Sequence, residues 1–232
     1  MKKKNAKKNW WQYTKRIFLW LFISQLFYII ILRWVNPPFT LTQLGSFFSG
    51  NGLKRDYVSF SEISPNAKLA VMAGEDQLFP DHNGFDIKAI KLAIKYNKKH
   101  PGSVRGASTI SQQVAKNVFL WQGGGFFRKG LEVYFTFMIE TLWSKERILE
   151  MYLNVSEMGE GIFGIESAAQ NYFKKPASKL SRSEAAQIAA ALPNPIRFTV
   201  KPLSKYVANR SQNIVSQMSN LESDVDVKEI IK

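Results

Sequence analysis

The chain has 232 residues, a formal net charge of +14 at pH 7 and no cysteine. This length is enough for one well-buried domain and at most a small additional lobe. Without cysteine the chain can form neither disulfides nor thiolate zinc sites, and its two histidines argue against an imidazole metal site. The positive charge does not predict a nucleic-acid partner, because it clusters mainly at the N-terminus beside an apolar segment.

The N-terminal segment has the pattern of a membrane anchor. Seven lysine and arginine residues crowd the first 16 positions, and no acidic residue occurs before Asp56. Residues 17–32 are apolar apart from one serine and one glutamine, slightly short of the ~20 residues that a membrane helix needs. Flanking tryptophans and Arg33 can act as interfacial anchors. We therefore predict a basic cytoplasmic tail over residues 1–16 and a transmembrane anchor over residues 17–35.

A cleaved signal peptide is the alternative interpretation of this segment. It would need a shorter apolar core and small residues at a cleavage site, and no such site follows. An uncleaved anchor is therefore favoured. Because basic flanks stay in the cytoplasm, residues from about 36 onward are expected on the opposite side of the membrane.

The rest of the chain is predicted to be mainly α-helical. Residues 36–63 are expected to form a linker with one short strand near 57–60, residues 64–222 a helical domain, and residues 223–232 a frayed tail. Helix starts are expected after the N-cap signals at Ser64, Asp86, Thr109, Ser144 and Ser181.

Two of the predicted helices have distinctive surfaces. The helix over 109–121 carries an apolar stripe and a polar stripe about 100° away. The helix Phe126–Trp143 is so apolar that it is either deeply buried or in contact with lipid. A final amphipathic helix is expected over 203–221.

A glycine motif at Gly159–Gly164 matches G-x-G-x-x-G literally. A dinucleotide site would need a strand before this motif and a βαβ frame around it. Residues 148–153 have a helical pattern instead, so the glycines are predicted to turn one helix into the next.

Two adjacent acids, Glu75 and Asp76, stand at the predicted end of a helix, before a turn that contains His82. They lie beside Phe79 and between apolar helices, where burial can raise a carboxyl pKa toward the range useful for proton transfer. The alternative is an ordinary helix end with common turn chemistry, and His82 alone is more often structural than catalytic.

The polar stripe of the helix over 109–121 is a second candidate site. Thr109 and Gln112 fit a capping box, which does not account for the amides and the lysine that continue the stripe. A helix N-terminus with hydroxyls and a nearby lysine suits an anion such as phosphate. The stripe consists of Ser108, Thr109, Gln113, Lys116 and Asn117.

A third candidate site lies on the apolar helix, where Arg128 and Glu132 stand four residues apart. An exposed ion pair is the simple explanation. Lys129 makes the cluster net positive, however, and cations beside a surface that contacts lipid suggest a lipid-linked diphosphate.

Five segments carry a resemblance to a known family. They are Glu75-Asp76-x-x-Phe79-x-x-His82-x-Gly84, Gly106-x-Ser108-Thr109-Ile110-x-Gln112-Gln113-x-x-Lys116-Asn117, Arg128-Lys129-x-x-Glu132, Lys145 to Gly164, and Ala191-Leu192-Pro193-Asn194-Pro195. In this order they resemble the signatures of the family 51 glycosyltransferases, the peptidoglycan polymerases, over about residues 65–200. The short chain lacks the S-x-x-K and K-T-G motifs of a transpeptidase domain, and so is similar to the monofunctional biosynthetic peptidoglycan transglycosylases.

The resemblance implies a mainly α, lysozyme-like glycosyltransferase domain with two lobes, a head and a membrane-facing jaw, and a groove between them. Phe126–Met138 would help to form the jaw. The implied reaction is attack by the 4-hydroxyl of lipid II on the anomeric carbon of a lipid-linked glycan chain. Undecaprenyl diphosphate would leave, and the new β-1,4 bond would form with inversion.

The resemblance also implies roles for individual residues. Glu75 would be the catalytic base, and Glu132 a second essential carboxylate near the diphosphate or the sugar. The cations Lys116, Arg128 and Lys129 would offset the diphosphate charge. The remaining expected substrate-binding residues are Asp76, Phe79, His82, Gly84, Ser108, Thr109, Gln112, Gln113 and Asn117.

The implied surroundings follow from the same family. No cofactor or metal site is expected, although a divalent cation could assist at the diphosphate. Expected partners are lipid II, the lipid-linked glycan, the membrane and division or wall-synthesis proteins, with the catalytic domain on the periplasmic side of the plasma (inner) membrane. The alternatives are a lysozyme-like hydrolase or lytic transglycosylase, and a non-catalytic scaffold of wall synthesis.

Overall fold

We describe the protein from a computed structural model that covers residues 3–103 and 105–232, with side chains from residue 10 onward. The chain divides into two compact units, residues 1–36 and 37–232. The first contains one long helix, α1 (Lys3–Ile31). Its segment Trp10–Ile31 is long and apolar enough to cross a membrane, and side chains such as Phe18 are exposed along it. The predicted anchor therefore coincides with a real helix that starts earlier than expected.

The segment over 36–63 is folded, so the prediction of a linker was wrong there. It contains α2 (Leu41–Phe48), β1 (Lys54–Arg55) and a short 3₁₀ helix, η1 (Phe60–Glu62). A capping box between Thr40 and Gln43 starts α2, a local signal that the sequence carries.

The strand expected near 57–60 is also absent, because a side chain replaces its partner strand. Asn154 accepts a hydrogen bond from Val58 N at 2.9 Å and donates one to Val58 O at 2.9 Å. The side-chain amide therefore satisfies both backbone groups of Val58.

Three helices pack together as one cluster of the domain: α3 (Pro65–Glu75), α9 (Arg182–Ala191) and α10 (Lys205–Leu221). A Cβ added at Gly74 would lie 3.1 Å from Cδ1 of Ile214, so the glycine allows α3 and α10 to approach closely. The predicted Ser64 cap and the Ser181-x-x-Glu184 capping box are confirmed.

A second cluster consists of α5 (Ile110–Phe119), α6 (Phe126–Leu142) and α7 (Lys145–Val155). The apolar stripe of the helix predicted over 109–121 is buried at Ile110, Val114 and Val118, whereas Trp121, beyond the end of α5, is 42% exposed. One face of α6 is buried, whereas Phe126 is 98% exposed on the other. Of the two environments considered for this helix, the structure therefore excludes deep burial on all sides.

A small sheet lies beyond α7. It joins β1, β3 (Ile162–Phe163) and β2 (Glu157–Gly159) in the order β1-β3-β2, with β1 parallel and β2 antiparallel to β3. Helix α8 (Ile165–Phe173) follows. The glycine motif forms the hairpin between β2 and β3, so the prediction that it turns one helix directly into the next was wrong. Because these two strands are adjacent and antiparallel, the motif lacks the βαβ frame that a dinucleotide site needs. Gly161 has φ +65°, and a Cβ there would lie 2.1 Å from Asn51 O, which is why the turn requires glycine.

The C-terminal tail is ordered, which corrects the prediction of a frayed end. After η2 (Ala177–Lys179), α9 and α10, the chain ends in α11 (Val225–Ile231). Val227 is buried, and Lys68 Nζ donates to Ile231 O at 3.3 Å. A seven-residue helix is too short for a helical period to be evident from the sequence.

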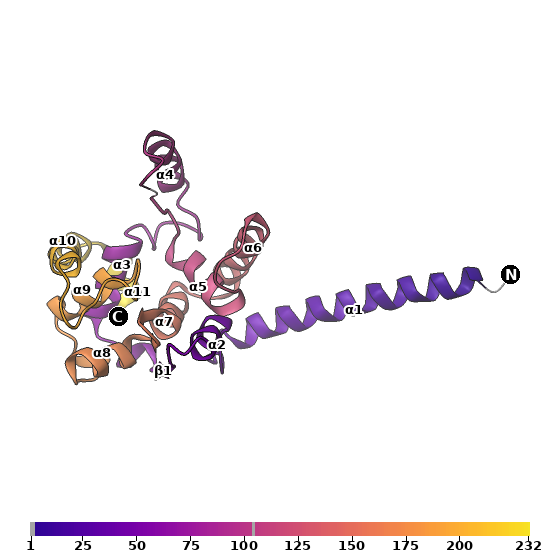
Figure 1. Cartoon of the computed structure of the whole chain (residues 1–232), viewed down its shortest axis with the longest axis horizontal. Coiled ribbons are helices and arrows are strands. Elements are labelled where there is room, and N and C mark those ends of the chain that lie inside the picture. The colour runs from indigo at the N-terminus through magenta and orange to yellow at the C-terminus, as the bar shows by residue number, and fades with distance from the viewer. Residues whose placement is uncertain (1–2, 104) are drawn as a thin grey trace. The chain divides into compact units, whose positions relative to one another are not determined.

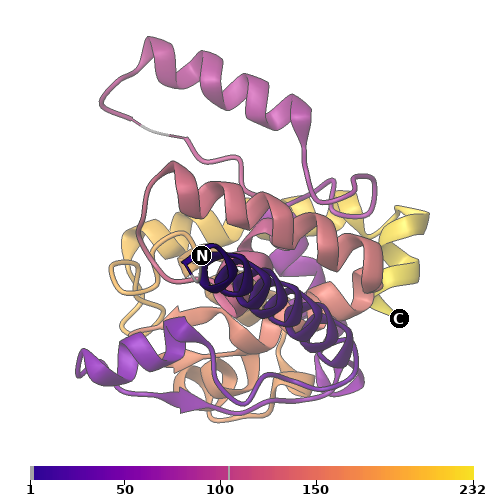
Figure 2. The same cartoon turned by 90° about the vertical axis from the view of Figure 1, so that its right-hand side faces the viewer.

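Helix α4 (Ile87–Lys99) is set apart from both clusters. Asp86 caps it as predicted, and none of its residues is buried. Figures 1 and 2 both show α4 standing clear of the neighbouring helices. The domain as a whole is mainly helical, as the sequence predicted.

Candidate active site

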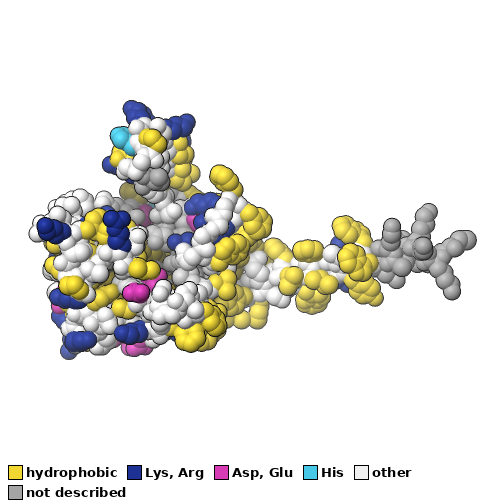
Figure 3. Space-filling model, viewed as in Figure 1, with side chains coloured by type: hydrophobic (Ala, Val, Ile, Leu, Met, Phe, Trp, Pro, Cys, Tyr) yellow, Lys and Arg dark blue, Asp and Glu magenta, His cyan; other side chains and the backbone are white. Residues whose placement is uncertain are grey.

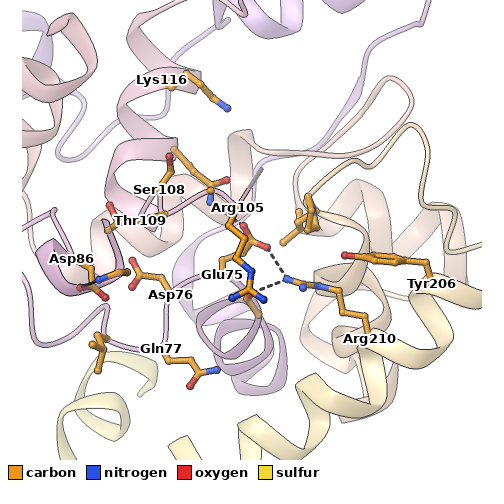
Figure 4. Close-up of a pocket in the computed structure, with 18 residues that line it drawn as sticks. Glu75, Asp76, Gln77, Asp86, Arg105, Ser108, Thr109, Lys116, Tyr206 and Arg210 are labelled. Atoms are coloured by element: carbon orange, nitrogen blue, oxygen red, sulfur yellow. Dashed lines mark hydrogen bonds and ion pairs between the residues drawn. The ribbon is translucent and has the colours of Figure 1, made fainter. Parts of the chain in front are cut away.

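A cleft of about 800 Å³ opens between the end of α3, the start of α5, and α10 (Figure 4). Six of the predicted site residues line it: Glu75, Asp76, Ser108, Thr109, Gln113 and Lys116. These residues come from two of the predicted signatures, which the fold therefore brings to one place.

Glu75 faces this cleft and is largely enclosed, with its side chain 11% exposed. Gln113 Nε2 donates to Glu75 Oε2 at 2.9 Å, and Arg210 Nη2 lies 3.6 Å from Glu75 Oε1. Burial raises the pKa of Glu75, while Gln113 and Arg210 act in the opposite direction. The result is a carboxylate that is more basic than an exposed glutamate and is still accompanied by donors that favour its ionised form.

Gln113 is oriented by a second residue behind it. The hydroxyl of Tyr152 donates to Gln113 Oε1 at 3.3 Å, so the amide NH2 is left to face Glu75. Burial raises the pKa of Tyr152 well above its ordinary value, and the phenol therefore remains a neutral donor.

Asp76 points away from Glu75 and holds the first loop together. Its Oδ2 accepts from Ile110 N at 2.9 Å, and its Oδ1 lies 3.0 Å from His82 Nε2. Gly84 N donates to His82 Nδ1 at 3.1 Å, so Nδ1 is the acceptor nitrogen and Nε2 carries the proton. Asp76 therefore links the end of α3 directly to the start of α5 and to the loop that carries His82.

Three further predicted residues support the site from inside the domain. Phe79 is fully buried beneath the loop, and Lys145 Nζ lies 4.6 Å from the centre of its ring. Gln112 completes the predicted capping box with Thr109, whose Oγ1 donates to Gly84 O at 2.7 Å. None of Phe79, Gln112 and Gly84 is among the residues that line the cleft.

The third predicted cluster lies on α6 and is formed as the sequence suggested. Glu132 is buried. Arg128 Nη1 donates to Glu132 Oε2 at 2.7 Å, and Lys129 Nζ donates to Glu132 Oε1. Two cations and one carboxylate leave this cluster net positive.

Lys116 connects this cluster to the cleft. Burial lowers the pKa of Lys116, Glu132 raises it, Arg128 and Lys129 lower it further, and Glu75 raises it. Lys116 thus lies within electrostatic reach of both catalytic candidates, Glu75 and Glu132.

A smaller cavity of about 250 Å³ adjoins the cleft, since the two share the lining residues Gln113, Lys116, Leu192 and Pro193. Asn117 lines the smaller cavity, where its Oδ1 accepts from Gln122 Nε2 at 3.2 Å. Lys116 therefore stands where two adjacent binding spaces meet.

Several residues of the cleft were not predicted from the sequence. Arg210 comes from α10, which carried no signal beyond its amphipathic period, and Arg105 comes from the loop before α5. Asp86 was recognised only as a helix cap. Gln77, Leu78 and Tyr206 also line the cleft and were not predicted as site residues.

Within residues 3–103 and 105–232, no group of three or more His, Asp or Glu side chains is arranged to hold a metal ion. Assistance by a divalent cation therefore stays a prediction that would rely on the phosphates of the substrate.

The fold and the cleft define a lysozyme-like transglycosylase domain. The family model described as Transglycosylase matches residues 42–219, and the chain therefore belongs to this family. Its beginning at residue 42 agrees with the folded state of the segment that contains α2.

The relatives are similar over most of the chain. The biosynthetic peptidoglycan transglycosylases of Yersinia pseudotuberculosis serotype O:3 (strain YPIII) and of Yersinia pestis (strain Pestoides F) are each 50% identical to it over 218 residues. These matches cover 91% of this chain and 90% of each relative. The family predicted from the five sequence motifs is thus confirmed.

Proposed function

We propose that this peptidoglycan glycosyltransferase polymerises lipid II into β-1,4 glycan strands. The glycosyltransferase activity itself follows from the family and the relatives. The observation that supports the rest is the placement of a largely enclosed carboxylate, Glu75, in an open cleft together with Lys116. Lys116 in turn interacts electrostatically with the cationic cluster at Glu132.

In the proposed reaction Glu75 takes the proton of the acceptor 4-hydroxyl. The hydroxyl oxygen forms a bond to the anomeric carbon of the donor, and the bond from that carbon to the diphosphate oxygen breaks. The electron pair leaves with undecaprenyl diphosphate. Because the nucleophile enters opposite the leaving group, the configuration at the anomeric carbon is inverted.

The leaving group acquires negative charge as its bond breaks, and cations can stabilise it there. Lys116, Arg128 and Lys129 are the candidates, with Glu132 holding the latter two in place. Ser108 and Asn117 would position the donor in the two adjoining cavities.

A lipid-linked substrate agrees with the surface of α6. Figure 3 shows hydrophobic side chains gathered over this helix, and Phe127 and Phe137 are 75% and 61% exposed. We assign this face to the membrane-facing jaw. With α1 as a single-pass anchor, the N-terminus would be cytoplasmic and the catalytic domain periplasmic, at the plasma (inner) membrane.

The test uses the purified full chain and lipid II. We expect glycan polymer and released undecaprenyl diphosphate, and a loss of roughly 10²–10⁴-fold in rate for Glu75→Gln. Glu229→Gln, an exposed substitution on α11, is the matched control and should keep its rate. Shortening of preformed glycan would indicate a hydrolase instead. Near-normal polymerisation by Glu75→Gln would refute the assignment of Glu75 as the base. No activity in the wild-type protein would favour a scaffold.

A further inference from the structure

Helix α4 is amphipathic and stands apart from the other described helices of the domain. It is 13 residues long, and it contains no buried residue. Ile87, Leu92 and Ile94 are 56%, 67% and 51% exposed. A folded domain seldom leaves such side chains in water along a whole helix, so the exposed apolar surface of α4 indicates an interaction site.

Charge is arranged on α4 in a single stripe. At about 100° per residue its five lysines fall within an arc of about 100°. The remainder is occupied by the isoleucines, the alanines, Leu92 and Tyr96, with Asn97 as the one uncharged polar residue. All five lysines are exposed: Lys88, Lys91, Lys95, Lys98 and Lys99. Residues 87–105 contain no acidic residue, and the nearby Asp86 accepts from Ala89 N at 2.8 Å as the helix cap.

The helix is also connected to the cleft. Asp86 and Ala89 at its start line the cleft, as does Arg105 beyond its end. Tyr96 stacks under Arg105, with the guanidinium 3.8 Å from the ring centre, and Asn97 Oδ1 accepts from Arg105 N at 2.8 Å. A surface that fixes α4 would therefore also fix the position of Arg105 at the edge of the cleft.

We infer that α4 binds an anionic lipid surface. A helix with a lysine stripe beside a broad apolar face lies in the plane of a membrane interface, with its apolar side chains at the boundary of headgroups and acyl chains and its lysines at the lipid phosphates. The chain carries a candidate membrane-spanning helix, so a bilayer is within its reach. In Figure 3 hydrophobic side chains of α4 and of α6 are visible on the same side of the domain.

This contact differs from the apolar surface of α6 in its dependence on lipid charge. Helix α6 presents phenylalanines, which enter any bilayer, whereas the stripe on α4 selects negatively charged headgroups. The inference does not depend on the transfer reaction, and its test uses no glycan substrate.

The absence of cysteine allows a single reporter to be placed on the full-length protein. We would introduce Leu92→Cys, attach an environment-sensitive fluorophore, and reconstitute the protein in nanodiscs of phosphatidylcholine alone or of phosphatidylcholine with phosphatidylglycerol. We expect a blue shift and a severalfold decrease in quenching by aqueous iodide only in the anionic nanodiscs. Val225→Cys, another exposed apolar position at 74%, is the matched control and should stay accessible in both.

Charge variants then test the lysine stripe. Lys91→Glu with Lys95→Glu should restore full quenching in anionic nanodiscs, whereas Lys91→Arg with Lys95→Arg should not. Thermal melting should be the same for all variants, because α4 has no buried residue. Equal quenching in the two kinds of nanodisc, or protection that survives the glutamates, would overturn the inference, as would protection that arises only when another protein is added.

Discussion

Arg210 Nη2 lies 3.6 Å from Glu75 Oε1 and donates a hydrogen bond to Gly74 O at 2.8 Å (Figure 4). One guanidinium thus contacts both the carboxylate and the backbone at the end of the helix that carries it. Because the side chain of Arg210 is 32% exposed, solvent screens part of this interaction. Its main effect is therefore expected on the ionisation and orientation of Glu75.

Substitution of Arg210 should move the pH profile of the reaction. A base must be unprotonated, so activity falls as the pH decreases through the pKa of Glu75. Arg210 lowers that pKa against the effect of burial, and Arg210→Gln should shift the acidic limb of kcat toward higher pH. Arg210→Lys should restore part of the shift. The control is Arg182→Gln, which removes a surface ion pair with Glu222 at 3.0 Å and should leave the acidic limb of the pH profile unchanged. An unchanged acidic limb in Arg210→Gln would refute the effect of Arg210 on the pKa of Glu75.

Replacement of Glu75 should increase stability at neutral pH. The folded protein has the higher pKa for Glu75 because burial disfavours the charged form. Between the ordinary value of 4.5 and the raised one, the folded state binds more protons than the unfolded state, so the free energy of unfolding decreases as the pH rises. Because glutamine does not ionise, Glu75→Gln removes this pH-dependent decrease in the free energy of unfolding. Denaturant unfolding should show a higher free energy of unfolding for Glu75→Gln than for the wild type at neutral pH, and no difference at a pH below the ordinary glutamate pKa. A difference of the same size at both pH values would contradict the prediction.

Replacement of Asp76 should decrease the stability of the fold, in contrast to replacement of Glu75. Asp76→Ala leaves the buried Ile110 N–H and His82 Nε2–H without their acceptor, which costs about 1–3 kcal/mol in the free energy of unfolding. Urea unfolding measures this loss. The exposed Asp81→Ala serves as control and should change stability little. Equal stability of the two variants would show that Asp76 does not hold the loop.

Gly84 should not tolerate a side chain. It has φ +85°, and an added Cβ would lie 2.7 Å from Thr136 Cγ2 and 2.9 Å from Glu140 Cγ. Gly84→Ala should therefore reduce the free energy of unfolding by about 1–3 kcal/mol through backbone strain and overlap. Gly102→Ala meets nothing within 4 Å and is the control for glycine replacement. If both variants unfold at the same denaturant concentration, the tight contact at Gly84 is not required.

Local signals made most of the helices predictable. The capping boxes at Thr109 and Ser181 are observed where the sequence placed them, because an N-cap depends only on residues within one turn. The short strands could not be found in this way. Strand β1 has two residues and pairs with β3, far along the chain, so neither a period nor a local signal marks it.

The site was predictable to the extent that its residues form sequence motifs. Glu75, Gln113 and Lys116 belong to two such motifs, and the fold brings them to one cleft. Arg210 could not be assigned, since its contact with Gly74 spans 136 positions and depends on how α10 packs on α3. The direction in which Asp76 points was equally hidden, because adjacent acids at a helix end look alike in a sequence.

The phenol of Tyr152 has a consequence for the base that it never touches. An amide presents oxygen on one side and NH2 on the other, and the Tyr152 hydroxyl occupies the oxygen side of Gln113. In a Tyr152→Phe protein the amide would be free to turn over and bring its oxygen against the carboxylate of Glu75. Tyr152 would thus determine whether the Glu75 carboxylate faces the NH2 group or the oxygen of Gln113. Its loss would lower the reaction rate without removing any contact to the substrate.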